Sequence, residues 1–146
     1  MTTSIHRRVD ALRAGEDATF VARLASGWAV LGERQVLPGY CLLLPDPVVP
    51  ALNALQGAAR AAFLADMAAL GDAVLAVTGA VRINYAIFGN LDPALHAHVI
   101  PRYHDEPPGL RTAQPWAYDW DAAPPFDPDQ HRDLRDRIHA ALARLA

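Results

Sequence analysis

Hydrophobic residues recur along the chain at two spacings, one typical of helices and the other of strands. The clearest helical pattern runs from Gln56 to Thr78, where apolar residues return every three or four positions and Gly79 follows in the place of a C-cap. Shorter patterns of the same kind cover residues 4–14 and 128–145. We therefore expect one long central helix and one helix near each end of the chain.

Five apolar runs that are too short for helices predict β-strands. They cover residues 18–24, 27–32, 40–44, 80–89 and 94–102. The first two flank a short turn, Ala25 to Gly27, and predict a hairpin. Five strands, with the long helix between the third and the fourth, describe an α+β domain with a largely antiparallel sheet.

Composition narrows the class of protein. The 146 residues suffice for a buried core, so we expect a single domain over 1–146. A net charge of -3 without a basic face argues against nucleic-acid binding. We expect no signal peptide and no apolar stretch long enough to cross a membrane, and hence a cytoplasmic protein. The one cysteine, Cys41, lies in the apolar run YCLLLP, which favours a buried, inert thiol.

Two histidines stand two residues apart in the last predicted strand, within the run ALHAHVIPR. Side chains alternate faces along a strand, so His96 and His98 share one face, and the apolar residues Leu95, Ala97 and Val99 share the other. The apolar face is suited to packing against the long helix. Because two buried imidazoles without partners would be destabilising, we interpret the pair as a functional site that faces away from this core.

Two kinds of chemistry use such a pair. The first is metal binding, because histidines on one strand face can chelate a zinc or iron ion. The candidates for a third ligand are Asp92, His104, Asp105 and Glu106. None of them stands at a spacing typical of a metal site, and Pro101 interrupts the strand before His104. The second is phosphoryl transfer, in which one imidazole attacks phosphorus and the other stabilises a phosphate oxygen.

The same run resembles the motif of the histidine triad (HIT) superfamily, His-φ-His-φ-His-φ-φ with φ apolar, and HVIPR matches a common ending of that motif. The register places His96 at the central, nucleophilic histidine and His98 at the last one, whereas Ala94 stands at the first. Upstream, VLPGYCLLLP is similar to another strand of the family, with Tyr40 at a histidine position. The resemblance covers about residues 20–103 as the core and leaves 104–146 as a C-terminal extension. It implies the HIT fold and a degenerate member of the branch that hydrolyses diadenosine polyphosphates.

The resemblance also implies roles for the phosphate-binding residues. His96 would attack the α-phosphorus and form a nucleotidyl-histidine, with its Nδ1 atom held by a backbone carbonyl. His98 and Asn90 would hold phosphate oxygens, and Asn84 matches a polar residue that faces the α-phosphate. Arg102 shares the face of the histidines and is a candidate for a distal phosphate, but pairing with Asp105 or Glu106 stays open.

The nucleoside pocket is less well defined by the sequence. Glu33 is the nearest substitute for the residue that holds the ribose hydroxyls in the family, and a solvated turn carboxylate remains the alternative. Trp28 is a candidate for stacking on a base, although it also suits the sheet.

The expected partner is a small nucleotide, with a diadenosine polyphosphate as the first candidate substrate. We expect no cofactor and no metal in the covalent step, and a Mg²⁺ ion carried by a polyphosphate substrate is compatible with this view. HIT domains commonly pair through the long helix and the fourth strand, and the apolar run VRINYAIFG predicts a homodimer. Two alternatives stay open: a non-catalytic nucleotide-binding module, and a metal-dependent enzyme built on His96 and His98.

Overall fold

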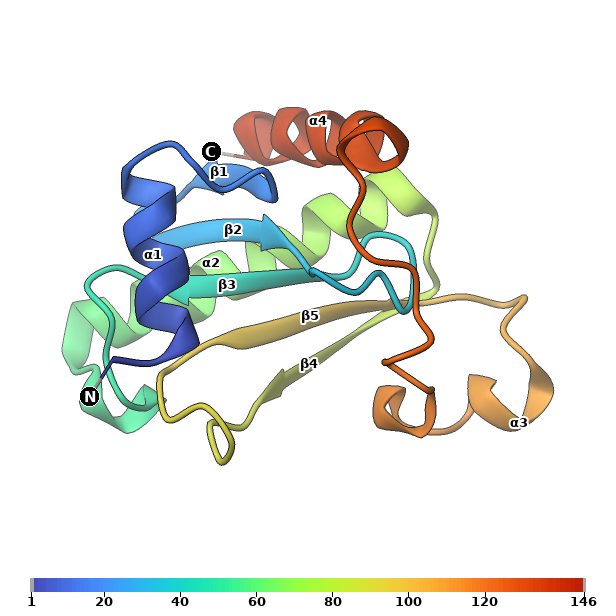
Figure 1. Ribbon diagram of the computed structural model, residues 1–146, viewed down its shortest axis with the longest axis horizontal. Coiled ribbons are helices and arrows are strands. Elements are labelled where there is room, and N and C mark those ends of the chain that lie inside the picture. The colour runs from blue at the N-terminus through green and yellow to red at the C-terminus, as the bar shows by residue number, and fades with distance from the viewer. Residues whose placement is uncertain (1, 146) are drawn as a thin grey trace.

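The computed structural model describes residues 2–145 and contains one five-stranded antiparallel sheet (Figure 1). The strands are β1 (Phe20–Arg23), β2 (Gly27–Leu31), β3 (Cys41–Pro45), β4 (Arg82–Ile87) and β5 (Ala97–Arg102), in the spatial order β1-β2-β3-β5-β4. The long helix α2 (Gly57–Thr78) connects β3 to β4. The predicted α+β class, the five antiparallel strands and the position of the long helix are therefore confirmed.

Strand β5 lies between β3 and β4, which places the histidine motif away from the sheet edges. His98 stands opposite Leu42 of β3 on one side and Ala86 of β4 on the other. The strand is shorter than the predicted 94–102, because residues 88–96 form an irregular loop. In this loop the Leu95 amide donates to the Val49 carbonyl at 2.8 Å instead of joining a ladder.

One face of the sheet is covered by α2 and by α4 (Pro128–Leu145), which lies beside α2 and β1 (Figure 1). Phe63, Leu70 and Val74 of α2 are fully buried in this cluster. The predicted C-cap is confirmed, since Gly79 adopts the left-handed conformation with φ 70° that favours glycine.

The other face is covered by α1 (Ser4–Arg13), which crosses in front of the sheet in Figure 1. Its apolar residues Ile5, Val9 and Leu12 join a second buried cluster that includes Ala94 and Ile100. Leu95, Ala97 and Val99 belong to the cluster on the α2 face. The predicted alternation along the motif strand is thus confirmed, and the histidines share their face with α1.

Buried residues also come from outside 20–103, the range that the family resemblance covers. Both terminal helices contribute buried residues, among them Val9 from α1 and Ile138 and Leu142 from α4. Between β5 and α4 the chain forms the short helices α3 (Pro108–Arg111) and η2 (Pro115–Ala117) and then returns toward α4 (Figure 1). The remaining short helix, η1 (Leu52–Ala54), precedes α2.

Helix α2 is long and apolar enough to cross a membrane by length and composition, with a mean hydropathy of 1.6 over 18 residues. The expectation that the chain contains no such stretch is therefore wrong on this measure. Packing of one side of α2 on the sheet explains part of its apolar character, as in the core helices of globular domains. Only 28% of that window is buried, however, so the helix also presents an apolar outer side that includes Leu64.

Candidate active site

His96 is held in the orientation that the motif implies. Its Nδ1 atom lies 2.7 Å from the carbonyl oxygen of Ala94, two residues earlier in the same loop. A carbonyl can only accept a hydrogen bond, so Nδ1 carries the proton and Nε2 keeps a free lone pair. Neutral imidazole with an exposed lone pair is a nucleophile at neutral pH.

His98 lies beside His96 and contacts Tyr40. The two imidazole centroids are 5.1 Å apart, and His98 Nδ1 lies 2.7 Å from the Tyr40 hydroxyl. Burial, together with the nearby imidazole of His96, lowers the pKa of His98 to about 4. His98 is therefore neutral at physiological pH.

A hollow of about 430 Å³ opens beside both histidines, between the motif strand and the first turns of α1. Helix α1 contributes Arg7 and Arg8 to its wall, and Glu33 and Asp92 contribute carboxylates. Arg8 is held in place by ion pairs with Asp17 and Glu33, both at 3.5 Å. The hollow thus brings the two imidazoles together with two guanidinium and two carboxylate groups, a lining that suits a polar ligand with anionic and hydroxyl groups.

The C-terminal extension supplies an aromatic wall that the sequence did not assign to the site. Trp116 meets His98 edge-on at 5.2 Å between centroids, and Phe88 meets Trp116 in the same way at 4.9 Å. Trp120 stacks on Trp116 and contacts Tyr40 edge-on. The cluster of aromatic residues in PWAYDW was the available signal, but its position beside a strand far away in sequence depends on tertiary structure.

Glu33 lies in the hollow beside the histidines, whereas Asn90 does not. Glu33 lines the hollow and its side chain is 70% exposed, in an ion pair with Arg8. Asn90 is exposed on the loop after β4 and does not line the hollow. Asp92, two residues further on, lines it instead and accepts a hydrogen bond from the Ser4 hydroxyl.

Arg102 and Asn84 lie together in a second hollow, away from the histidines. Arg102 is buried and binds the Glu106 carboxylate at 3.0 Å, which is one of the pairings left open by the sequence. Its remaining N–H groups donate to the Asn84 side chain and to the carbonyls of Leu110 and Ala113, each at 2.8 Å. With its donors used in this way, Arg102 ties the extension to the sheet and does not fit the predicted role of a distal phosphate ligand. Asn84 is likewise engaged by Arg102.

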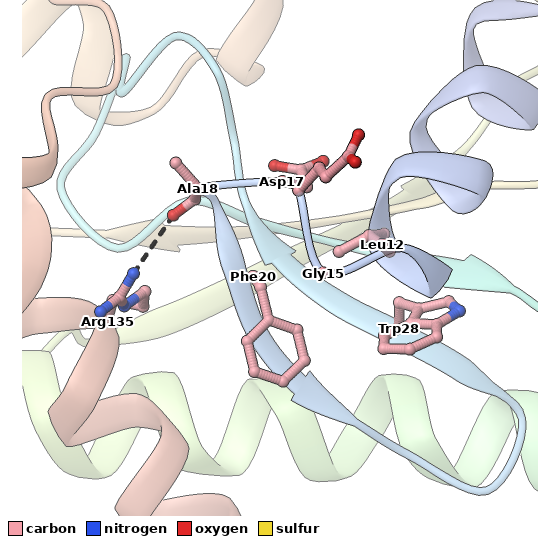
Figure 2. A pocket seen from close by; sticks show the side chains of 8 residues that line it. Leu12, Gly15, Asp17, Ala18, Phe20, Trp28 and Arg135 are labelled. Carbon is pink, nitrogen blue, oxygen red and sulfur yellow. Dashed lines mark hydrogen bonds between the residues drawn. The ribbon is translucent and has the colours of Figure 1, made fainter.

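Trp28 also lies apart from the histidines, in a cavity of about 500 Å³ at the opposite end of α1 (Figure 2). Figure 2 shows Trp28 and Phe20 on the hairpin, with Leu12 of α1 and Arg135 of α4 beside them. The indole N–H of Trp28 donates to Asp46 at 2.9 Å. The structure therefore gives Trp28 a place in the hairpin and no contact with the histidine hollow.

The alternative of a metal site lacks a third ligand in the described part of the chain. Across residues 2–145, no group of three or more histidine, cysteine or carboxylate side chains is arranged to hold a metal ion. His104, Asp105 and Glu106 follow the strand end, and Glu106 is engaged by Arg102. Cys41 is buried in the core, and burial raises the pKa of its thiol, as expected for an inert cysteine.

Similar structures identify the fold. No protein-family model and no curated protein matches the chain. A histidine triad protein from Marinobacter aquaeolei superposes with a TM-score of 0.78 at 21% identity and covers 100% of both chains. A histidine triad protein from Sinorhizobium meliloti has a TM-score of 0.73 at 23% identity, covering 89% of this chain and 93% of its own.

A hypothetical histidine triad nucleotide-binding protein from Sulfolobus tokodaii has a TM-score of 0.73 at 15% identity, covering 94% of this chain and 91% of its own. At these identities the likeness concerns the fold. The chain therefore has the fold of histidine triad proteins, which confirms the fold that the motif implied.

Proposed function

We propose that this protein is a nucleotide hydrolase or nucleotidyl transferase whose reaction passes through a nucleotide bound covalently to His96. The observation that carries the proposal is the 2.7 Å contact from His96 Nδ1 to the Ala94 carbonyl. It leaves the lone pair of Nε2 free beside a hollow lined with two arginines. The fold, shared with a protein described as nucleotide-binding, supports the same ligand class.

In the first chemical step His96 Nε2 attacks the α-phosphorus of the bound nucleotide: the P–N bond forms, the P–O bond to the leaving group breaks, and its electron pair departs with that oxygen. The proton stays on His96 Nδ1, hydrogen-bonded to the Ala94 carbonyl, and this bond stabilises the positive charge that the imidazole gains as the P–N bond forms. His98, next to the nucleophile, is placed to donate a hydrogen bond to a phosphate oxygen as negative charge develops there. Water or another acceptor then attacks phosphorus, and the electron pair of the P–N bond returns to Nε2.

The hollow supports a polar, anionic substrate. Arg7 lines the hollow, and Asp92 Oδ1 is buried without a hydrogen-bond partner among residues 2–145, as in a site whose polar ligand completes the pairing. Glu33 is our candidate for the ribose hydroxyls, since its carboxylate reaches the same hollow. A diadenosine polyphosphate remains the first candidate substrate, with any Mg²⁺ ion carried by its phosphates.

We also propose a two-fold symmetric homodimer. Apolar side chains remain exposed on the edge strand and on the outer side of the long helix, including Tyr85 at 42% and Leu64 at 37%. Strand β4 forms the sheet edge on this side. An unpaired apolar edge favours association with another copy through the same surface.

The proposal is tested by trapping the intermediate. A phosphoramidate on histidine is stable in base and labile in acid, so rapid quenching at alkaline pH with labelled nucleotide should yield labelled protein. His96→Ala should lose both the label and turnover, whereas His104→Ala, which changes an exposed histidine outside the hollow, should keep both. Turnover by His96→Ala at the parent rate would refute the assignment. Nucleotide binding without any adduct or turnover would instead favour the non-catalytic module.

A further inference from the structure

We infer that Tyr40 holds His98 as a neutral hydrogen-bond donor, and that the site is therefore selective for leaving groups that depart as stable anions, namely phosphate or polyphosphate. The inference rests on the proposed function and specifies its substrate class, the phosphoanhydrides of nucleotides. Tyr40 is a positioning residue in this scheme, because it acts on substrate only through His98.

The direction of the Tyr40–His98 hydrogen bond follows from counting donors and acceptors. Among the described residues, His98 Nδ1 is the one hydrogen-bond partner of the Tyr40 hydroxyl, at 2.7 Å. Tyr40 is 4% exposed, so a hydroxyl proton pointing elsewhere would be buried without an acceptor. If Tyr40 donates, Nδ1 accepts, and the single proton of the neutral ring resides on Nε2. The two histidines thus hold opposite tautomers, His96 with a free Nε2 and His98 with a protonated one.

The position of Tyr40 is set by its neighbours on several sides. A Cβ atom on Gly32 would lie 2.2 Å from the Tyr40 ring, so the glycine provides the space that the phenol occupies. The Gln35 amide donates to the Tyr40 carbonyl at 2.9 Å, and Trp120 packs edge-on against the ring. A phenol held on all these sides keeps its hydroxyl directed at His98.

Among residues 2–145, no other group that lines the hollow is placed to supply a proton at neutral pH. Glu33 is paired with Arg8, and Asp92 accepts a hydrogen bond from Ser4, so both carboxylates serve as acceptors. Arg7 and Arg8 do not release protons in proteins. On its other sides His98 meets the rings of Phe88 and Trp116, which carry no acidic proton.

The lack of a proton donor discriminates between leaving groups. When His96 Nε2 attacks a phosphoanhydride, the P–N bond forms, the bridging P–O bond breaks, and its electron pair leaves on a phosphate oxygen that is stable as an anion. The same attack on a phosphoramidate breaks a P–N bond, and the departing nitrogen must take up a proton because an amide anion is too basic to leave. A neutral His98 can donate a hydrogen bond to an oxygen but is a poor source of that proton.

The first test compares two substrates that share the adenosine 5′-phosphoryl group, a diadenosine polyphosphate and adenosine 5′-phosphoramidate. General acid catalysis contributes about 10²- to 10⁴-fold, so we expect kcat/KM to favour the anhydride by at least about 10²-fold. Equal or faster turnover of the phosphoramidate would overturn the inference and leave the proposed function standing. Absence of turnover with both compounds would overturn the proposed function, and the preference with it.

The second test measures the tautomer of each histidine directly and then the effect of removing the Tyr40 hydroxyl. In protein labelled with ¹⁵N-histidine, the NMR spectrum at neutral pH should show His98 with an unprotonated Nδ1 and a protonated Nε2. His96 should show the opposite tautomer. In Tyr40→Phe, His98 should lose its preference for the Nε2-protonated tautomer. The variant should lower kcat on the anhydride by about 10-fold with little change in KM, an effect of the size seen when a hydrogen-bond partner of a functional histidine is removed. The matched control is Tyr118→Phe, which removes a hydroxyl with an equally short hydrogen bond, 2.7 Å to Glu106, outside the hollow. A protonated Nδ1 on His98 in the parent protein, or unchanged kcat in Tyr40→Phe, would overturn the role of Tyr40.

Discussion

Replacing Arg102 with methionine separates a structural role of this residue from a substrate-binding one. The side chain of Arg102 is 8% exposed and that of Glu106 is 3% exposed, so the pair is removed from water. Methionine keeps much of the length of the side chain but leaves the Glu106 carboxylate without its charged partner. The carbonyls of Leu110 and Ala113 also lose the N–H groups that hold the extension.

The expected loss of stability is large. Breaking a buried ion pair by removing one partner costs about 3–5 kcal/mol, because an uncompensated charge remains in a poorly solvated site. Burial works against the charged form of Glu106, but hydrogen bonds from Arg102, Tyr118 and the Tyr103 amide outweigh it and lower the pKa of this carboxyl. Two of these three donors remain in the variant. We therefore expect the free energy of unfolding to fall by about 3 kcal/mol, toward the lower end of that range.

The measurement is urea denaturation at neutral pH, followed by tryptophan fluorescence. Arg82→Met is the matched control, since Arg82 stands opposite Arg102 in the β4–β5 register but is exposed, and exposed substitutions usually change stability by less than about 0.5 kcal/mol. A loss below about 1 kcal/mol in Arg102→Met would refute the structural account. A normal unfolding midpoint combined with a raised KM for a polyphosphate nucleotide would restore the phosphate-binding role.

Two further predictions concern pH and assembly. Between about pH 6.5 and pH 4 the unfolded chain binds a proton at His98 that the folded protein does not, so stability should fall as pH decreases through this window, by up to about 3 kcal/mol. His98→Gln should flatten this part of the pH profile of urea midpoints, and a profile as steep as that of the His104→Gln control would count against the assignment. Light scattering at micromolar concentration should give the mass of a dimer. Tyr85→Arg on the exposed edge strand should shift the measured mass toward that of the monomer. A monomeric parent protein would contradict the proposed assembly.

The fold could be predicted in outline from the hydrophobic pattern because the pattern reflects burial directly. The alternation over 94–100 separates the two clusters correctly, since each side chain in a strand has only two directions to take. The position of β5 between β3 and β4 could not be predicted from this pattern. Pairing order depends on contacts between residues far apart in sequence, which periodicity does not report.

The candidate site was predictable where a contact joins residues that are close together in the sequence. His96 meets the carbonyl of Ala94 within the same short segment, so the motif alone implies the contact. Arg102 shares the strand face of the histidines, and only the path of the C-terminal extension shows that it forms an ion pair with Glu106. The arginines of α1 were missed for the same reason, since a helix at the start of the chain reaches a motif near residue 96 only through tertiary packing.

The alanine at the first position of the motif is compatible with an intact nucleophile, because position 94 serves the site through its backbone. The Ala94 carbonyl orients His96, and any residue at this position offers the same oxygen. Its methyl group is fully buried in the cluster formed with α1, so the small side chain does not widen the hollow. A histidine here would have to fit into that buried cluster, to which Ile5 and Leu42 also belong. The first motif position therefore belongs to the buried cluster shared with α1, and the hydrogen bond to His98 comes from Tyr40, the residue before the neighbouring strand β3.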